Sequence, residues 1–346
     1  MTTMIPAGKL SIPLAYNEEF LKLNDEQRVA LYLSLNCKKF NLIHGFPGTG
    51  KSTIISLLIK ILVHHQKKVL LICYTNLAID NILKKIKLNY HRALKQELNF
   101  ENVTELKNYF DSLDLVVGTC FSFSDIVFLN RKFDFCIVDE ASQQHLLLTL
   151  IPLHISRKFI LVGDHLQLKP LATKSEALRM SLFEYLSKRN NVCELRRQYR
   201  MGEEIMSIAN TLFYNNKMIG FGKKSAVHFV DSRKYKDIKD FLEKIDLTEK
   251  TAILCYFNIQ VSHVKSIVGK KCRVETVDRF QGSESEEIIL IFDPIMDCEI
   301  MCSKERLNVG ITRAKNKLTL VGDKEKMLQF EIFEALFGTL NDLGIY

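Results

Sequence analysis

Short apolar runs alternate with longer stretches of helical periodicity along most of this chain. The apolar runs predict strands at 40–44, 69–74, 115–117, 133–138, 159–162, 227–230, 252–256, 274–277, 288–292 and 318–321. Helical periodicity is clearest at 54–63, 78–88, 203–213, 237–245 and 324–337. Strands that alternate with helices predict parallel sheets covered by helices. Because the runs are apolar throughout rather than at every second position, we expect both faces of each sheet to be buried.

The number of predicted strands indicates two domains of the α/β class. Ten strands fit two sheets better than one, and 346 residues are enough for two domains of ordinary size. A boundary is expected near residues 172–182, after the loop that holds Lys169 and Pro170. We therefore predict a first domain over residues 1–178 and a second over 179–346.

A glycine-rich segment after the first predicted strand carries the strongest chemical signal. Residues 45–53 read G-F-P-G-T-G-K-S-T and match the phosphate-binding pattern G-x-x-x-x-G-K-[ST]. Such a loop turns backbone N–H groups toward a phosphate, and the N-terminus of the following helix adds partial positive charge. Lys51 can reach the β- and γ-phosphates, and the Ser52 hydroxyl can bind Mg²⁺. The predicted nucleotide-binding residues of this loop are Gly45, Pro47, Gly48, Thr49, Gly50, Lys51, Ser52 and Thr53.

Two adjacent carboxylates, Asp139 and Glu140, follow the apolar run at 133–138. A pair of this kind is often no more than a solvated surface feature. Here it ends a predicted buried strand downstream of a phosphate-binding loop, which favours a catalytic role. Asp139 would hold the Mg²⁺ shell, and Glu140 would orient and deprotonate the attacking water.

Further polar side chains with suitable chemistry follow later in the chain. Gln167 lies just beyond the predicted strand at 159–162, where a glutamine could sense a γ-phosphate. The segment 195–201 supplies arginines and an aromatic ring, and the segment 306–315 supplies arginines on an expected helix. Arginines from a neighbouring domain stabilise the charge that builds up during phosphoryl transfer. Most surface arginines are merely solvated, and we hold Arg196, Arg197 and Arg306 to be of that kind.

Composition limits the class of protein without identifying a partner. A hydrophobic content of 47% and a charged content of 25% are those of a soluble globular protein, and the net charge of +8 is compatible with a polyanionic partner. Nine single cysteines with no C-x-x-C pattern favour a reducing compartment over a disulfide, zinc or iron–sulfur framework. We expect no membrane span and see no targeting signal, since no apolar run approaches ~18 residues.

Taken in order, these motifs resemble those of superfamily 1 helicases, specifically their 5′-to-3′ branch. The matching segments are 23–27, 45–53, 74–81, 117–120, 138–143, 163–170, 198–201, 276–282 and 307–315. Within that branch, segments 78–83, 133–143 and 198–206 look most like the helicase part of the eukaryotic DNA replication helicase–nuclease family. The nonsense-mediated-decay RNA helicase family is second in likeness.

The resemblance implies two tandem RecA-like P-loop domains, ATP and Mg²⁺ in the cleft between them, and single-stranded nucleic acid across the top of both. It implies that Gln27 reads adenine, that Tyr199 stacks near it, and that Gly282 and Glu284 approach the nucleotide from the second domain. Carried over by position, the catalytic residues are Lys51, Glu140, Gln167, Arg200 and Arg313, with Ser52 and Asp139 on the metal. The residues along the strand's phosphates are Thr75, Asn76, Thr119 and Thr276, which make sequence-independent contacts.

The chain also departs from the replication helicase–nuclease pattern. The matching segments begin at residue 23, so we expect no β-barrel ahead of them, and no cysteine set for the family's iron–sulfur nuclease is present. The interpretation is an ATP-dependent 5′-to-3′ helicase or translocase on single-stranded DNA, nuclear, without nuclease activity in this chain and open to a nuclease or replication partner on another chain. The alternatives are an RNA helicase of the nonsense-mediated-decay type and an ATP-gated nucleic-acid clamp or scaffold that does not unwind.

Overall fold

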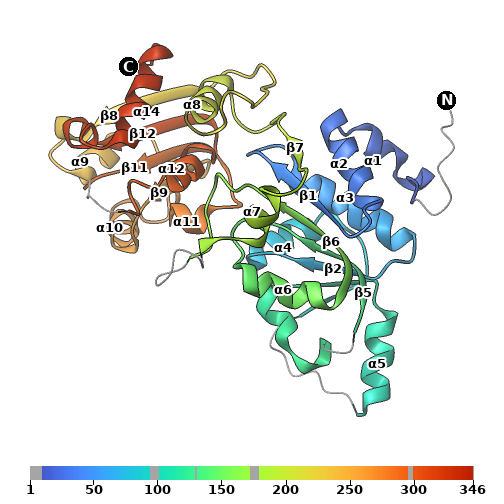
Figure 1. Cartoon of the computed structure of the whole chain (residues 1–346). Coiled ribbons are helices and arrows are strands. Elements are labelled where there is room, and N and C mark those ends of the chain that lie inside the picture. Colours follow the sequence, from blue (N-terminus) through green and yellow to red (C-terminus); the bar gives the residue numbers. More distant parts are fainter. Residues whose placement is uncertain (1–9, 94–100, 129–130, 172–178, 295–298, 346) are drawn as a thin grey trace. The chain divides into compact units, whose positions relative to one another are not determined.

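The computed structural model describes residues 10–93, 101–128, 131–171, 179–294 and 299–345 (Figure 1). The chain divides into two compact units. The first comprises Met1–Phe46, Gly50–His165 and Lys169–Leu195. The second comprises Pro47–Thr49, Leu166–Leu168 and Arg196–Tyr346. The first unit thus continues past the expected boundary at 178/179, and the residues just before that boundary, 172–178, lie outside the described part of the chain.

The first unit is built on a parallel sheet that has seven strands among the described residues, in the order β3-β4-β2-β5-β6-β1-β7. Its strands are β1 (Phe40–Gly45), β2 (Val69–Ile72), β3 (Tyr90–Arg92), β4 (Leu115–Gly118), β5 (Phe133–Val138), β6 (Ser156–Gly163) and β7 (Cys193–Leu195). Its helices are η1 (Leu14–Tyr16), α1 (Asn17–Leu21), α2 (Asp25–Leu35), α3 (Lys51–His64), α4 (Asn76–Leu83), α5 (Val103–Ser112), η2 (Cys120–Ser124), η3 (Ile126–Phe128), α6 (Leu146–His154) and α7 (Leu182–Ser187).

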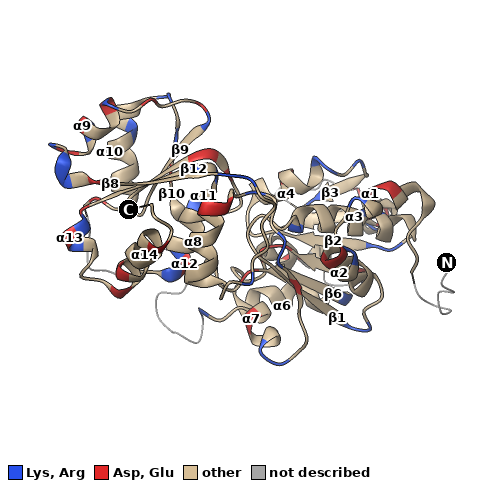
Figure 2. Ribbon diagram, turned by 90° about the horizontal axis from the view of Figure 1, so that it is seen from above, with Lys and Arg blue, Asp and Glu red and all other residues tan. Residues whose placement is uncertain are grey.

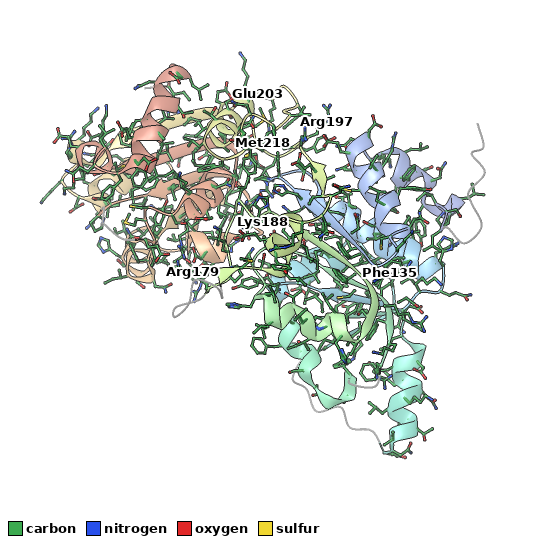
Figure 3. All side chains as sticks on the ribbon, in the orientation of Figure 1. Phe135, Arg179, Lys188, Arg197, Glu203 and Met218 are labelled. Atoms are coloured by element: carbon green, nitrogen blue, oxygen red, sulfur yellow. The ribbon has the colours of Figure 1, made fainter. Side chains whose placement is uncertain are left out.

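Both faces of this sheet are buried, as the continuous apolar runs predict. In β2, Val69 and Leu71 pack into a core with α2 and α3, whereas Leu70 and Ile72 pack into a second core with η2 and α7. Phe135 of β5, labelled in Figure 3, belongs to the first of these cores. Alternate residues of such a strand enter two different cores, so both of its faces lose contact with water. An unbroken apolar sequence therefore stabilises the fold at every position of the strand.

The second unit has its own parallel sheet, with five strands in the described residues in the order β10-β9-β11-β12-β8. Its strands are β8 (Ala226–Asp231), β9 (Thr251–Cys255), β10 (Arg273–Thr276), β11 (Ser285–Ile291) and β12 (Ala314–Gly322). Its helices are α8 (Glu203–Phe213), η5 (Ser232–Lys234), α9 (Ile238–Glu243), α10 (Asn258–Val268), α11 (Val277–Phe280), α12 (Lys304–Ile311), α13 (Lys324–Met327) and α14 (Glu331–Asp342). Two tandem parallel-sheet α/β units confirm the predicted fold class.

All ten predicted strands are present, and the predicted helix at 203–213 has the bounds of α8. Two short strands, β3 and β7, are absent from the prediction. The expected helix at 324–337 is wrong in one respect, because it is two helices that are separated at residues 328–330. The expected helix at 78–88 is α4, which begins at Asn76 and ends at Leu83. The helix begins earlier than expected because the Thr75 side chain accepts a hydrogen bond from the Ala78 N–H and caps its amino end.

Basic and acidic residues are interspersed along the described chain (Figure 2). Within the described residues, no helix has both the length and the apolarity that crossing a membrane requires. The cysteines that the structure describes are free thiols, and Cys298 lies outside them. Burial raises the pKa of the Cys120 and Cys255 thiols to about 12, so both behave as small neutral side chains.

Candidate nucleotide site and nucleic-acid edge

Three predicted catalytic segments of the first unit follow neighbouring central strands of its sheet. β5, β6 and β1 are neighbours, and all three run parallel. Their carboxyl ends therefore lie side by side. The phosphate-binding loop follows β1, Asp139 and Glu140 follow β5, and Asp164 follows β6. Sites of open α/β sheets lie outside the carboxyl ends of the strands, which is where this topology places the residues predicted to bind phosphate.

The phosphate-binding loop adopts a backbone that only glycine takes readily at two positions. Gly48 has φ +74° and Gly50 has φ +80°, both in the left-handed region. Gly50 is also the N-cap of α3, which begins at Lys51. The Lys51 ammonium donates to the Gly45 carbonyl at 2.8 Å, so it lies across the loop. The amino end of α3 is thereby presented together with a cation, as phosphate binding requires.

Gln27 lies against this loop. An atom added at the Cβ position of Gly50 would lie 2.7 Å from the Gln27 amide nitrogen. Gln27 is buried and forms a capping box with Asn24, in which its Oε1 accepts from the Asn24 N–H at 3.0 Å. The structure thus brings Gln27 beside the phosphate loop, and its reading of adenine stays a prediction.

The carboxylate pair after β5 is under both electrostatic and backbone strain. Asp139 is buried, and its pKa is raised to about 7, first by burial and then by the Glu140 carboxylate, against the lowering effect of Lys51. Glu140 has φ +49°, a conformation that costs a non-glycine residue about 1–3 kcal/mol and is concentrated at functional sites. Its Oε2 atom is buried and has no hydrogen-bond partner among the described residues.

These observations fit a nucleotide with a divalent cation. The buried Asp139 carboxylate and the half-buried Glu140 carboxylate, which has an orphaned oxygen, repel each other and are stabilised by positive charge and by a hydrogen-bonded water. Ser52 and Asp139 are the oxygen donors that would hold Mg²⁺, which binds hard oxygen ligands and usually keeps several waters. Glu140 would then be left to act on water.

The remaining predicted catalytic residues, Gln167, Arg200 and Arg313, belong to the second unit. The Arg313 guanidinium donates to Gln167 Oε1 at 3.2 Å, and both side chains are almost fully buried, at 2% and 1% exposure. Asn308 Nδ2 donates to the Leu166 carbonyl at 2.8 Å and so holds the segment that bears Gln167. The expectation that residues 306–315 are helical is wrong for Arg313. α12 ends at Ile311, and Arg313 follows its last turn, donating back to the Val309 carbonyl.

Arg200 and Glu284 are directly paired. Arg200 Nε donates to Glu284 Oε2 at 2.6 Å, and Lys315 Nζ lies 3.0 Å from Glu284 Oε1. Burial raises the pKa of Glu284, but the two cations outweigh burial, so the net pKa is lowered. Gly282 has φ +81°, and a Cβ there would meet no atom within 4 Å. Arg200 and Glu284 thus form one charged cluster, with Gly282 nearby in the chain.

Arg200 and Tyr199 also touch the phosphate-loop segment of the second unit, Pro47–Thr49. The Tyr199 N–H donates to the Gly48 carbonyl at 2.9 Å. A Cβ at Gly48 would lie 2.7 Å from the Arg200 Cβ. The absence of a side chain at Gly48 therefore lets the chain around Tyr199 pass close to residues Pro47–Thr49.

The residues predicted to follow a nucleic-acid strand lie just after strand ends. Thr75 follows β2, Thr119 follows the neighbouring β4, and Thr276 ends β10 of the second sheet. Each hydroxyl is engaged locally: Thr75 accepts from Ala78, Thr276 accepts from Arg279 at 3.3 Å, and Thr119 lies 3.2 Å from the Ser122 hydroxyl. Their contacts with nucleic acid stay a prediction.

Comparison with known proteins agrees with this geometry. Residues 41–322 match the model of the viral superfamily 1 RNA helicase core domain family. The chain belongs to this family of superfamily 1 helicases. It is 32% identical over 372 residues to the DNA replication ATP-dependent helicase/nuclease DNA2 of Gallus gallus, a match that covers 91% of this chain and 37% of the relative. Human DNA2 is 30% identical over 410 residues, with 92% and 39% covered. The helicase core thus spans well under half of these relatives.

Solved structures support the fold. The complex of Arterivirus nonstructural protein 10 (helicase) with DNA superposes with a TM-score of 0.57 at 15% identity, covering 87% of this chain and 63% of that one. At this identity the likeness extends to the fold only.

Two positioning contacts of the helicase core are missing from the sequence interpretation. The Arg92 guanidinium on β3 donates to Asp80 Oδ1 at 2.7 Å and to both the carbonyl and the side-chain oxygen of Asn76 at 3.2 Å. His44 on β1 pairs with Asp164. Residues 90–92 read Tyr-His-Arg, a polar triplet without the apolar run that marks the other strands. The β-favouring Tyr90 is the one local signal, and it is weak.

Proposed function

We propose that this helicase core hydrolyses ATP and uses the energy to move 5′ to 3′ along single-stranded DNA. The observation that carries the proposal is the environment of Glu140. Its backbone is strained, its carboxylate has an orphaned oxygen, and it follows β5, which is separated by β6 from the strand that leads to the phosphate loop. A general base for water needs this combination of proximity to the phosphate and freedom from other partners.

We propose the following roles for the residues of the site. Lys51 and the N–H groups of the loop from Gly45 to Thr53 bind the phosphates, and Glu140 orients and accepts a proton from the attacking water. Mg²⁺, held by Ser52 and Asp139, would supply charge stabilisation at the phosphate oxygens. Arg200 and Arg313 stabilise the charge that develops in the transition state, and Gln167 reports the γ-phosphate.

Nucleic acid would stimulate the hydrolysis. Thr75, Asn76 and Thr119 are proposed to contact the backbone of a strand along the carboxyl edge of the first sheet, and Thr276 would do so in the second unit. Contacts to phosphates and sugars fix a strand without reading its sequence. The names of the DNA2 relatives, which describe DNA replication, support DNA as the track. We propose the nucleus as the place of action. We further propose that these residues carry no nuclease chemistry of their own and that a nuclease or replication factor on another chain works with them.

RNA is the second candidate track, since the matching family model describes viral RNA helicases. Matched DNA and RNA oligonucleotides of one mixed sequence separate the two, through dissociation constants and through stimulation of ATP hydrolysis. Duplexes with a 5′ or a 3′ tail then test direction. We expect preference for DNA, unwinding from the 5′ tail, and no cleavage of either strand. A protein that neither hydrolyses ATP nor responds to any strand contradicts the proposal.

A further inference from the structure

Arg306 and Asp278 form a bidentate ion pair in the second unit. Arg306 Nε donates to Asp278 Oδ1 at 2.9 Å, and Arg306 Nη2 donates to Asp278 Oδ2 at 3.0 Å. The Arg306 side chain is 16% exposed, and that of Asp278 is 36% exposed. The expectation that Arg306 is merely solvated is therefore wrong. Two parallel hydrogen bonds between planar groups fix the orientation of both side chains as well as the distance between them.

The pair joins two short helices that lie against each other in the second unit (Figure 1). Asp278 lies in the first turn of α11, which follows β10 directly. Arg306 lies in the first turn of α12, and its N–H donates to the Ser303 hydroxyl that caps this helix. A helix of one turn has little stability of its own, so its position is set by the groups that hold it. The burial of Val277 and Phe280 and the ion pair hold α11 in place.

The amino end of α11 is a residue that we propose contacts the strand. Thr276 ends β10 and caps α11, because its hydroxyl oxygen accepts from the Arg279 N–H at 3.3 Å. The same hydroxyl can still donate its hydrogen to a phosphate oxygen, since a hydroxyl both donates and accepts. A strand bound at Thr276 would therefore be bound to α11 itself.

The Arg313 guanidinium is shared between the segments of the same two helices. Its Nε donates to the Val309 carbonyl of α12 at 3.1 Å, and its Nη1 donates to the Ser283 carbonyl, shortly after α11, at 3.4 Å. The Ser285 N–H also donates to the Arg313 carbonyl at 3.1 Å. The orientation of this guanidinium therefore depends on where α11 lies relative to α12, which is the arrangement that the ion pair fixes.

Buried polar atoms around α11 lack hydrogen-bond partners. Burial raises the pKa of Tyr256, and the charges of Arg306 and Asp278 then act on that pKa in opposite directions, so the Tyr256 hydroxyl lies near the pair. This hydroxyl has no partner among the described residues, and neither have the two side-chain polar atoms of Gln281, which follows α11. A buried polar atom without a partner is unfavourable. A shift of α11 that supplies partners is therefore favoured.

We propose that the Arg306–Asp278 pair positions α11 against α12 so that a strand bound at Thr276 sets the orientation of Arg313. This inference rests on the proposed function and adds two positioning residues to it. Strand binding acts on the amino end of α11, and the pair carries the resulting shift to α12. The Arg313 guanidinium, which is bonded to both segments, then takes the orientation that stabilises charge on a γ-phosphate. Without the pair, α11 still binds the strand but moves without α12.

The test compares ATP hydrolysis by the full chain with and without a saturating single strand, of DNA or RNA, whichever stimulates the wild type more. Asp278→Asn removes the charge and keeps the shape of the side chain, whereas Arg306→Lys keeps the charge and loses the planar fork. In both variants we expect stimulation by the strand to fall by about fivefold or more, the lower end of the usual range for coupled sites. Basal turnover should change little, because Arg313 keeps its bonds to Gln167 and Val309.

A second measurement does not depend on turnover. Coupling between two sites is reciprocal, so a non-hydrolysable ATP analogue should change the dissociation constant for the strand by the same factor by which the strand changes that for the analogue. In Asp278→Asn both factors should approach unity. The double variant of Asp278→Asn with Arg306→Gln should lose no more stimulation than either single variant, because each residue acts through the other.

The matched control breaks a different arginine–carboxylate pair of the second unit. Asp231→Asn removes the partner of Arg233, whose Nη2 lies 2.7 Å from Asp231 Oδ2. Asp231 ends β8, and β8 and β10 are the two edges of the five-stranded sheet in the described residues. We expect this variant to be stimulated by the strand as the wild type is.

Three results would overturn the inference. Unchanged stimulation in both variants would show that the pair does not carry the coupling. Equal losses of basal and stimulated turnover would reduce the pair to a contribution to folding. Weaker strand binding with unchanged maximal stimulation would make the two residues part of the strand site. If the wild type is stimulated and the variants behave like Asp231→Asn, this inference alone fails. If no strand stimulates the wild type, the proposed function fails and this inference fails with it.

Discussion

The His44 imidazole and the Asp164 carboxylate lie 3.0 Å apart and are both buried, at the ends of adjacent strands. His44 lies near the end of β1 and immediately precedes Gly45, and its backbone is paired with Gly163 of β6. Asp164 is three residues before Gln167. The His165 ring packs 4.4 Å from the His44 ring, and burial, followed by His44, lowers the pKa of His165. The pair thus ties the entry of the phosphate loop to the segment that leads to Gln167.

Removal of the His44 hydrogen bond should therefore destabilise the first unit. His44→Leu leaves the buried Asp164 carboxylate short of one partner, which we expect to lower the free energy of unfolding by about 1–3 kcal/mol. His44→Gln can still donate to Asp164 and serves as the control, with a smaller loss. Urea denaturation of the full chain measures both variants. Equal losses of unfolding free energy in the two variants would show that packing of the His44 ring, and not its hydrogen bond, stabilises the unit.

Glu140→Gln should separate ATP binding from hydrolysis. The substitution keeps the size of the side chain and its ability to hydrogen-bond but removes the base, so turnover should fall by roughly 100-fold or more. The dissociation constant for ATP should stay near that of the wild type, since the phosphate loop is unchanged. Equilibrium binding and steady-state hydrolysis supply the two numbers. A turnover rate equal to that of the wild type in Glu140→Gln would contradict the assignment of Glu140 as the base.

Sequence predicts best where a physical constraint is local. The phosphate loop needs particular residues at fixed spacings, and a strand buried on both faces needs an unbroken apolar run, so β1, β5 and their adjoining site residues are legible in the sequence. Local signals say nothing of a pairing such as that of Arg313 with Gln167, which are far apart in the chain and meet only after folding. The position of Gln167 after a predicted strand singled out that residue, whereas the family resemblance assigned Arg313 to the same phosphate. The same holds for Arg92, since an edge strand of three residues is stabilised by its neighbour rather than by its own propensity.

Gly48→Ala should abolish most ATP binding. A Cβ would lie 2.7 Å from the Arg200 Cβ and 3.2 Å from Gln198 Oε1, and φ at this position is +74°. The loop must shift, which displaces the N–H groups that we propose bind phosphate. Gly269→Ala is the matched control. Gly269 has φ +61° and open space around it, so an alanine there introduces backbone strain without a steric clash. We expect the ATP KM to rise at least tenfold in Gly48→Ala. Similar KM values for the two variants would contradict the steric argument.

Arg313→Ala should lower turnover more than it weakens ATP binding. The guanidinium is almost fully buried and contacts Gln167. Its proposed interaction with a γ-phosphate should strengthen as charge develops in the transition state. Comparison of kcat with the dissociation constant for ATP measures this. The double variant with Gln167→Ala should lose less than the sum of the two single losses, because the residues act as a pair. A variant with weaker binding and unchanged turnover would make Arg313 a ground-state ligand.

Arg92→Ala should weaken the binding of single-stranded nucleic acid without changing its salt dependence. The Arg92 guanidinium is occupied by Asp80 and by two oxygens of Asn76, so it orients Asn76 at the start of α4 instead of neutralising a phosphate. Loss of that support lets the Asn76 amide turn, and we expect the dissociation constant to rise several-fold. Arg92→Lys should behave like the alanine variant, because an ammonium cannot hold both partners with the planar fork of a guanidinium.

The comparison that decides this role is the slope of affinity against salt concentration. Each phosphate contact that is lost lowers the slope by about 1. We therefore expect Arg92→Ala and the wild type to have parallel slopes for a mixed-sequence strand of DNA, with a constant offset in affinity. Arg157→Ala is the control, since Arg157 is exposed and lies near the amino end of β6, away from the strand ends that bear the threonines. A slope that falls by about 1 in Arg92→Ala would instead make Arg92 a direct phosphate ligand.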